Sequence, residues 1–468
     1  MQIKIALPKG NLLTETAALL EQAGWGLTDY SAKARLYRLK SAKFSNLLAK
    51  MFHEKDIPIQ VAIGNYDLGI CGSDWTDELL AKYPSSALAK VKDLGYGKGA
   101  LYLVASRSST FSLEDVRSRS ERLCIATEYP NLAETLALKY RLRRFSIFPV
   151  WGAAEAYPPE TADLALVAAK GNEPQLNNGL MPVARVFDSS AFLIANKDSW
   201  KSKDLSELVA SLYENLPAAP AMPPVPRGSA SAAAHPTSEA LPEDIISLAI
   251  PDGHHQPPTL DLLRKAGIRF DEDDFRRGNH RPSIGLEGVR AKVIRPQDMP
   301  LQVANGNFDL AITGKDWVLS HRYQFPSIPV TELVDLKFGR VKIVAVVSKH
   351  LPVADVHGLR RFCGERSSWL RVASEYVNIA DRYARDNHLG LYRVIPTWGA
   401  TEAFLPEDAD LLIENTETGA TIARHDLKII DQLFESTACL IANKDSLANI
   451  KKAQRIESIA EMLRKAVE

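Results

Sequence analysis

The sequence predicts an α/β protein that contains two copies of one domain, each with two lobes and a cleft between them. Three observations predict this class. Apolar, strand-like runs alternate with helix-like segments, five sequence blocks occur twice in one order, and a stretch rich in proline, alanine and serine separates the two sets. At 468 residues the chain is too long for one core and should form about two to four domains.

The repeat is close enough to align the two halves. VAIGNYDLGICGSDW at 61–75 matches VANGNFDLAITGKDW at 303–317, an offset of 242 at the aspartates (309 − 67). VWGAAEA matches TWGATEA at an offset of 247 (398 − 151), and three further blocks repeat in the same order. A fixed order with a shift of only five residues between blocks indicates a tandem duplication.

Within the first copy the elements follow one another in a regular order. IKIALP at 3–8 predicts a strand, LTETAALLEQAG at 13–24 has the apolar spacing of a helix that ends at Gly24, and 60–72 predicts a second strand and helix unit. Further strands are expected at GALYLVAS, RLCIATEYP, FSIFPVW and DLALVA. This alternation predicts parallel sheets covered by helices, with ligands at the carboxyl ends of the strands.

The blocks also predict domain boundaries. The residues between the copies include few aromatic or large apolar side chains, so they cannot offset the entropy of ordering, and we expect an extended linker there. The predicted units are a first copy at 1–215, with lobes of about 1–100 plus 185–215 and 101–184; a linker at 216–244; and a second copy at 245–468, with lobes of about 245–342 plus 432–468 and 343–431.

Composition excludes several classes of function. Lysine plus arginine equals aspartate plus glutamate at 57 each, so no net charge draws the chain to nucleic acid or an acidic membrane. The N-terminus lacks the apolar core of a signal peptide, and no apolar run approaches the roughly 18 residues of a membrane span. We therefore expect a cytoplasmic protein with neither nucleic acid nor membrane as a partner.

Neither the cysteines nor the histidines predict a metal site. The four cysteines have no C-x-x-C spacing, which argues against structural zinc and against a disulfide framework. His254 and His255 are adjacent but lack a third ligand at a recognisable spacing. Four tryptophans in the repeated blocks are expected in the core or on a cleft wall: Trp75, Trp151, Trp317 and Trp398.

One turn in the second copy has the pattern of a phosphate site. The apolar run 411–413 predicts a buried strand, and it is followed by Glu414-Asn415-Thr416-Glu417-Thr418-Gly419-Ala420-Thr421, which we call the 414–421 loop. A helix is expected to begin there. Hydroxyls, one glycine and a helix N-terminus direct several donors at one point, which suits a phosphate, although such a turn can also serve only to cap its helix.

The aligned turn of the first copy has lost this pattern. It reads Val167-Ala168-Ala169-Lys170-Gly171-Asn172-Glu173-Pro174. Asn172 replaces the glycine, Glu173 brings negative charge to where a phosphate would lie, and Pro174 has no N–H to donate. The sequence therefore predicts that only the second copy holds the phosphate.

These blocks carry a resemblance to a known family. LPKGNL, KDIP, G-x-x-DLGI-x-G-x-DW, DLGYGK, ATEYPNLA, ETGAT and ESTACLIANK, in this order, resemble ATP phosphoribosyltransferase, the first enzyme of histidine biosynthesis, and each copy resembles the short-form catalytic subunit. The resemblance covers nearly all of both copies. It implies that each copy has a two-lobed, periplasmic-binding-protein-like (type II) fold with parallel-rich sheets.

The resemblance implies a reaction between ATP and 5-phosphoribosyl 1-pyrophosphate, with substrate-bound Mg²⁺, that gives phosphoribosyl-ATP and pyrophosphate. Adenine N1 displaces pyrophosphate from a cation-like sugar carbon. The reaction therefore needs a phosphate anchor, cations around the leaving group and a grip on the ribose, but little proton transfer.

The family's functional positions map onto this sequence as follows. The implied phosphoribosyl-binding residues are Glu414, where the family usually has Asp, with Glu417, Thr418, Gly419, Ala420, Thr421 and Glu402. The implied nucleotide-binding residues are Gly314, Lys315, Asp316 and Tyr376. The implied catalytic cations are Arg295, in R-P-x-D-x-P, and Arg276, which falls near another family arginine.

Losses in the two copies are complementary at the first strand. Lys9 of LPKG is kept in the first copy, whereas the second copy has Asp252 there, and the first-copy equivalent of Arg295 is His53. If one chain imitates the family's dimer as an intrachain pseudo-dimer, Lys9 would complete a composite site in the second copy. In the alternative interpretation, the first copy is a scaffold and Lys9 is a relic.

The sequence thus predicts one productive site per chain, mainly in the second copy. A second hypothesis keeps the fold without the chemistry, as a ligand-sensing or regulatory protein. By resemblance, a regulatory subunit like histidyl-tRNA synthetase is an expected partner. The sequence leaves open whether chains form further homo-oligomers and whether the first copy binds a nucleotide or effector.

Overall fold

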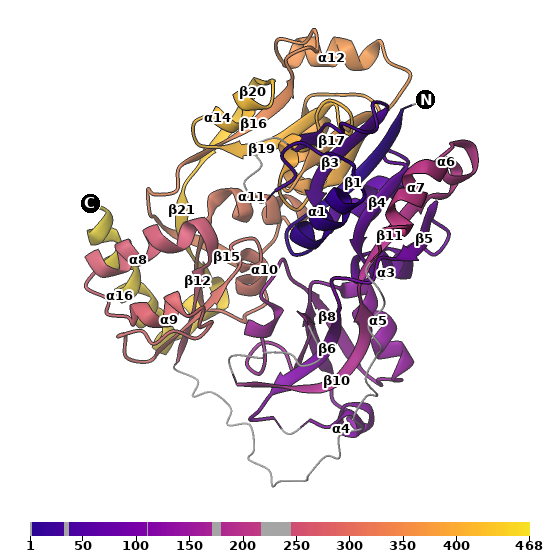
Figure 1. The fold of residues 1–468 in the computed structure, drawn as a ribbon. Coiled ribbons are helices and arrows are strands. Elements are labelled where there is room, and N and C mark those ends of the chain that lie inside the picture. The colour runs from indigo at the N-terminus through magenta and orange to yellow at the C-terminus, as the bar shows by residue number, and fades with distance from the viewer. Residues whose placement is uncertain (1, 32–36, 110, 171–178, 217–244) are drawn as a thin grey trace.

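A computed structural model describes residues 2–31, 37–109, 111–170, 179–216 and 245–468 (Figure 1). The predicted linker at 216–244 lies outside the described residues, except for Leu216. The same holds for 171–174 of the first-copy turn.

The first lobe of the first copy is a six-stranded sheet with the strand order β2-β3-β1-β4-β11-β5. Strands β1, β3 and β4 run parallel, while β11 is antiparallel to β4 and β5. The elements are β1 (Ile3–Lys9), α1 (Leu13–Gln22), β2 (Arg38–Leu39), β3 (Leu47–His53), α2 (Asp56–Ala62), β4 (Leu68–Gly72), α3 (Ser73–Lys82), β5 (Leu88–Asp93), β11 (Ala191–Asn196), α6 (Lys197–Ser202) and α7 (Ser206–Tyr213).

The second lobe of the first copy is a five-stranded sheet with the order β10-β6-β9-β7-β8. Seven of the eight residues of β6 and the first four residues of β9 are buried, as their apolar sequences predict. The elements are β6 (Gly99–Ser106), α4 (Leu113–Ser118), β7 (Leu123–Thr127), α5 (Pro130–Lys139), β8 (Phe145–Pro149), η1 (Ala154–Ala156), β9 (Leu164–Lys170) and β10 (Leu180–Ser189).

The second copy repeats both sheets, with the orders β13-β12-β14-β21-β15 and β18-β17-β19-β16-β20. Its first lobe contains β12 (Ile246–Pro251), η2 (Gly253–His255), α8 (Gln256–Lys265), α9 (Glu272–Arg276), β13 (Val289–Ile294), α10 (Met299–Ala304), β14 (Leu310–Gly314), α11 (Lys315–Gln324), β15 (Val330–Asp335), β21 (Ala438–Asn443), α15 (Lys444–Ala448) and α16 (Ile450–Val467). Its second lobe contains β16 (Val341–Ser348), α12 (Val356–Gly364), β17 (Leu370–Ser374), α13 (Val377–Asp386), β18 (Tyr392–Pro396), η3 (Thr401–Phe404), β19 (Leu411–Thr416), α14 (Ala420–Arg424) and β20 (Leu427–Ser436). The predicted α/β class with two lobes in each copy is confirmed.

The two copies pack head to tail, so that each first lobe contacts the second lobe of the other copy. One buried apolar cluster joins Phe52 and Tyr66 of the first copy to Phe404 and Leu412 of the second. Another joins the β6 to β9 lobe to Ile294 and other residues of the β12 lobe. Figure 1 shows β1 and β3 beside β17 and β19. Two of the apolar cores therefore belong to both copies.

Buried charges cross the same contacts. The ammonium of Lys50, which is 2% exposed, lies 2.9 Å from a carboxylate oxygen of Asp408, which is fully buried. That oxygen also accepts a hydrogen bond of 3.1 Å from the hydroxyl of Tyr66. Burial lowers the pKa of Lys50, and the charge of Asp408 opposes this change. The pair is therefore an ion pair inside the contact between copies.

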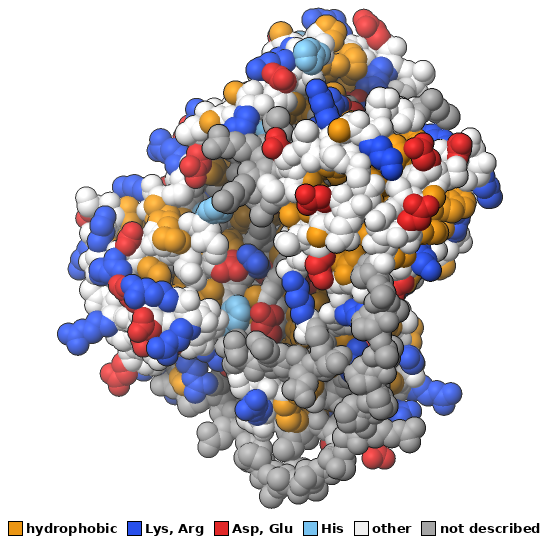
Figure 2. All heavy atoms as spheres, in the orientation of Figure 1, with side chains coloured by type: hydrophobic (Ala, Val, Ile, Leu, Met, Phe, Trp, Pro, Cys, Tyr) orange, Lys and Arg blue, Asp and Glu red, His pale blue; other side chains and the backbone are white. Residues whose placement is uncertain are grey.

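Lys, Arg, Asp and Glu side chains are interspersed over the face shown in Figure 2, in keeping with the zero net charge. Among the described residues, no helix is long and apolar enough to cross a membrane.

Candidate functional site

The 414–421 loop spans the last residues of β19, the turn at 417–419 and the first residues of α14, as the sequence predicts. Leu411 to Ile413 are buried, which explains the strand. Gly419 then adopts a φ of 76°, a left-handed conformation that favours glycine. Its N–H donates to Oγ1 of Thr416 at 2.9 Å, and the N–H of Ala420 donates to Oγ1 of Thr418 at 3.3 Å. Threonine hydroxyls thus shape the turn.

Three carboxylates gather beside this loop. Burial, followed by the charges of Glu375 and Glu402, raises the pKa of Glu414 to about 8. Burial and the charge of Glu402 raise the pKa of Glu375 to about 7. Each carboxylate disfavours ionisation of its neighbours, so the cluster favours ligands that carry hydroxyl donors or positive charge.

The first copy reaches this cluster through Tyr37 and Lys9. The hydroxyl of Tyr37 donates to Oε1 of Glu402 at 3.4 Å and accepts a hydrogen bond of 3.1 Å from Nζ of Lys9. The ring of Tyr37 also stacks on His425, which directly follows α14, with centroids 5.3 Å apart and planes 15° apart. The structure therefore brings Lys9 within one side chain of Glu402 and the 414–421 loop.

The predicted nucleotide-binding residues divide into two groups. The hydroxyl of Tyr376 donates to Asp316 at 2.6 Å and accepts a 3.1 Å hydrogen bond from the amide of Asn415, which links both residues to the loop. A Cβ added at Gly314 would lie 2.1 Å from Oδ1 of Asp316, so a larger residue there would displace the Asp316 carboxylate. Lys315 instead pairs with carboxylates of β15.

The Lys315 ammonium lies 2.9 Å from a carboxylate oxygen of Glu332 and 2.9 Å from one of Asp335. Burial opposes its charge, but these two carboxylates raise the pKa of Lys315 above its usual value. Lys315 is therefore held on β15 and is not part of the chain of contacts from Tyr376 to the loop.

In the first copy, the surroundings of Glu155, the equivalent of Glu402, have different residues. Nε2 of His280 lies 3.3 Å from Oε1 of Glu155, which repeats the contact of Tyr37 with Glu402. Arg295 pairs with Asp252 at 3.1 Å, and its Nε lies 2.8 Å from where a Cβ would be on Gly152. Burial opposes the charge of Glu155, but His280 and Arg295 bring its pKa below the usual value.

This placement corrects the expectation that Arg295 lies with the 414–421 loop. Because the copies pack head to tail, the side chain of Arg295 contacts the second lobe of the first copy. Its first-copy equivalent is His53. Burial and the charges of Lys55 and Lys9 lower the pKa of His53 to about 4, so it is neutral at pH 7. Of these cations, Lys9 is the one that the structure brings to the loop.

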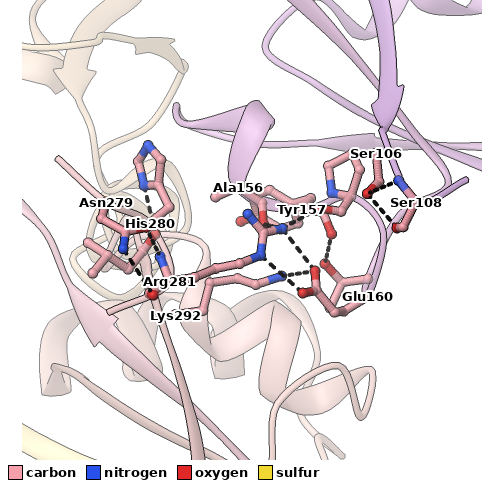
Figure 3. Close-up of polar contacts among 12 residues, drawn as sticks. Ser106, Ser108, Ala156, Tyr157, Glu160, Asn279, His280, Arg281 and Lys292 are labelled. Carbon is pink, nitrogen blue, oxygen red and sulfur yellow. Dashed lines mark hydrogen bonds and ion pairs between the residues drawn. The ribbon is translucent and has the colours of Figure 1, made fainter. Parts of the chain in front are cut away.

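Arg276 also lies away from the loop. It is exposed on α9, where it pairs with Glu272 at 2.8 Å and Asp273 at 3.3 Å within its own helix. The arginine of this region that contacts the other copy is Arg281. Its guanidinium donates to both carboxylate oxygens of Glu160, at 3.0 and 2.9 Å, and Lys292 donates to the same carboxylate at 2.8 Å (Figure 3).

Sequence reasoning missed several residues near the loop. Glu375 repeats as Glu128 in the ATEY and ASEY blocks, so the repeat itself contained the signal. No sequence pattern points to Tyr37, because the residue at the equivalent place in the second copy is a histidine, His280. The two residues are equivalent because their backbone carbonyl oxygens accept hydrogen bonds from matching residues of β3 and β13.

The fit of a resident metal can be tested on these side chains. Within the described ranges, no group of three or more His, Cys, Asp and Glu residues is arranged to hold a metal ion.

The fold and these contacts define the class of the protein: a doubled, two-lobed α/β protein with a threonine and glycine loop at the carboxyl end of a central strand. An acidic cluster borders the loop, and a lobe of the other copy faces it.

Comparison with known proteins identifies the family. The profile of HisG, ATP phosphoribosyltransferase, matches residues 53–217 and 295–465, so it matches both copies. An ATP phosphoribosyltransferase of Chlorobaculum parvum is 34% identical over 229 residues, which cover 48% of this chain and 72% of that protein. One of Solibacter usitatus is 32% identical over 225 residues, covering 48% and 73%. The chain belongs to the ATP phosphoribosyltransferase family, and the predicted tandem duplication is confirmed.

Two solved structures are also similar. The ATP phosphoribosyl transferase (HisG:HisZ) complex from Thermotoga maritima has 21% identity and a TM-score of 0.40, over 48% of this chain and 98% of that one. The aliphatic sulphonate binding protein SsuA from Escherichia coli has 13% identity and a TM-score of 0.30, over 48% and 72%.

Proposed function

We propose that this enzyme of histidine biosynthesis transfers the phosphoribosyl group of 5-phosphoribosyl 1-pyrophosphate to N1 of ATP at one productive site per chain. The observation that carries this proposal is the contact chain from Lys9 through Tyr37 to Glu402, beside the 414–421 loop. It joins a cation of the first copy to the acidic cluster of the second.

In this proposal the threonines and backbone N–H groups of the loop bind the 5-phosphate, while Glu414 and Glu417 accept hydrogen bonds from the ribose hydroxyls. The bond from C1 to the pyrophosphate oxygen breaks, and a bond from C1 to N1 of adenine forms. The sugar carbon becomes positively charged on the way, which favours ionisation of the nearby carboxyl groups, and their negative charge then stabilises the sugar carbon. Lys9 stabilises the negative charge on the leaving pyrophosphate.

Mg²⁺ enters as part of the sugar pyrophosphate, where it neutralises the leaving group. Removing Mg²⁺ with a chelator should therefore abolish turnover and leave the fold of the chain unchanged. A chelator-treated chain that kept full activity would contradict this part of the proposal.

The decisive experiment compares two glycines in equivalent lobes. Gly419 and Gly179 both have left-handed φ values, 76° and 71°, and both have room for a side chain. Gly419→Asp should lower turnover at least ~100-fold, because it places a carboxylate where the phosphate binds. Gly179→Asp, with comparable backbone strain, should retain activity within about threefold.

Phosphoribosyl-ATP formation by the purified chain can be followed by absorbance. Equal losses in the two variants would overturn the assignment of the site to the second copy. No turnover by the native chain, even with a regulatory subunit added, would favour the ligand-sensing hypothesis.

The arrangement of partners is part of this proposal. The contacts between copies support an intrachain pseudo-dimer, in which one chain replaces the two subunits of a dimer. A regulatory subunit resembling histidyl-tRNA synthetase and a cytoplasmic location are further expectations. Stimulation of turnover by such a subunit would test the first, and fractionation of cells would test the second.

A further inference from the structure

A large cavity lies between the two copies, and no residue of the 414–421 loop lines it. Its volume is about 1260 Å³, enough for a small organic ligand. Residues at equivalent positions of the two copies line it in pairs: Trp75 and Trp317, Trp151 and Trp398, Glu128 and Glu375, and Lys55 and Gln297. The cavity therefore has two halves built from matching parts.

The first-copy half holds an ammonium group of the protein. Nζ of Lys55 lies 2.5 Å from Oε2 of Glu128 and 3.5 Å from the carbonyl oxygen of Trp151. The same nitrogen lies 4.8 Å from the ring centroid of Trp75, which stacks on Tyr129 with centroids 4.2 Å apart. A carboxylate, a carbonyl and an aromatic face together form a site for a cation.

The second-copy half has the same parts without the ammonium. Glu375 replaces Glu128, and Trp317 stacks on Tyr376 with centroids 4.4 Å apart. Gln297 stands at the position of Lys55, and its buried Oε1 has no hydrogen-bond partner in the described part of the chain. No described residue donates to Glu375 or offers it a cation, and its charged neighbours are the carboxyl groups of Glu402, Glu414 and Asp56.

We propose that the second-copy half of this cavity binds a small organic cation, a protonated amine or amidinium on a flat apolar body. The charged group would donate to Glu375 and to Oε1 of Gln297, above the face of Trp317. The apolar body would pack against Trp151 and Trp398. The carboxylate selects for charge and the tryptophans select for an organic rather than a hydrated inorganic cation. This site goes beyond the proposed transferase function, and it shares Glu375 with the acidic cluster beside the 414–421 loop.

The test uses the full chain without nucleotides and benzamidine as the probe. Calorimetry should give one site per chain, and binding should quench tryptophan fluorescence. Gln297→Lys should weaken benzamidine binding at least about 30-fold, because its ammonium would pair with Glu375 as Lys55 pairs with Glu128. Gln324→Lys, the same substitution on the exposed rim of the cavity, should change affinity by less than about threefold.

Two further measurements complete the design. Lys55→Gln should free Glu128 and raise the stoichiometry to two sites per chain. Benzamide, which has the same shape but no charge, should bind the native chain at least about 30-fold more weakly. Thermal unfolding would show that each variant is folded, and the Lys55→Gln stoichiometry decides if Gln297→Lys does not fold. The proposal is overturned if the native chain does not bind benzamidine, if binding survives Gln297→Lys, or if benzamide binds equally well.

Discussion

Individual side chains determine how equivalent places in the two copies differ in charge. Lys9 and His53 in the first copy have Asp252 and Arg295 as equivalents in the second. Arg295 is partnered by Asp252, whereas Lys9 contacts Tyr37 beside the 414–421 loop. Two exchanges of charge therefore make the matching places chemically different.

Tyr37 tests whether the first copy completes the site of the second. Tyr37→Ala removes both the stack on His425 and the link from Lys9 to Glu402, so kcat/KM should fall about 10-fold or more. His280→Ala, at the equivalent position, should leave kcat/KM within about twofold. Steady-state kinetics with both substrates checks this, and equal effects of the two variants would contradict a composite site.

Lys9→Ala should lower kcat at least about 10-fold if its ammonium stabilises the leaving pyrophosphate, because that charge is largest in the transition state. Single-turnover measurements separate this step from binding. A change of only a few-fold would instead agree with the interpretation of Lys9 as a relic.

Glu414 gives a prediction about pH. Its pKa in the folded chain is about 8, above its ordinary value of 4.5. Between these pH values the Glu414 carboxyl group is therefore ionised in the unfolded chain but protonated in the folded chain. The free energy of unfolding should therefore decrease as pH rises through this window. Glu414→Gln should flatten the dependence and stabilise the ligand-free chain at pH 8.5 by about 1–3 kcal/mol, with little effect at pH 4.5.

Denaturant unfolding at several pH values measures this difference. Glu417→Gln, in the exposed part of the same loop, serves as the control and should leave the pH dependence unchanged. A native dependence that persists in Glu414→Gln would assign the titration to other buried carboxylates, such as Asp298.

At the scale of elements, the strands and their loops could be predicted from sequence, but the way in which the lobes face one another could not. The apolar run of β19 and the glycine at 419 predict the loop because both act locally. Tyr37 and Glu402 are 365 residues apart and meet only because the copies pack head to tail. A repeat gives equivalent positions and says nothing about which lobes are in contact, so it could not show that Arg295 faces the first copy.

Arg276 shows a second limit. It is predicted only because it falls near an arginine of the family pattern, and the segments before β3 and β13 have different sequences and few shared residues. The arginine that contacts the other copy, Arg281, lies in a loop without a strong pattern. Only the folded chain shows which arginine faces a carboxylate of the other copy.

The contact between β3 and the β19 lobe can be tested through its buried ion pair. Lys50→Met should destabilise the chain by about 3–5 kcal/mol, because it leaves the carboxylate of Asp408 buried without its ammonium partner. The double variant Lys50→Met with Asp408→Leu should recover most of this loss. Urea unfolding of the four forms measures the coupling, and additive losses would show that the two charges do not interact.

At the scale of the whole molecule, the copies share their cores. Because two apolar clusters contain residues of both, residues 1–216 or 245–468 alone would expose a broad apolar face. Each half expressed alone should be aggregated or loosely packed and bind a hydrophobic dye, whereas both halves expressed together should form a folded complex. A half that unfolds cooperatively by itself would contradict this prediction.

Glu155 and Glu402 have different partners, so the two halves of this chain can acquire substitutions independently of each other. In an assembly of identical subunits, every substitution occurs on both sides of the symmetry axis, so a change that suits one side must be tolerated by the other. Here His280 can vary without altering Tyr37, since each is encoded separately. Random mutagenesis confined to codons 111–170 should therefore accept far more substitutions in active clones than the matching region of the second half.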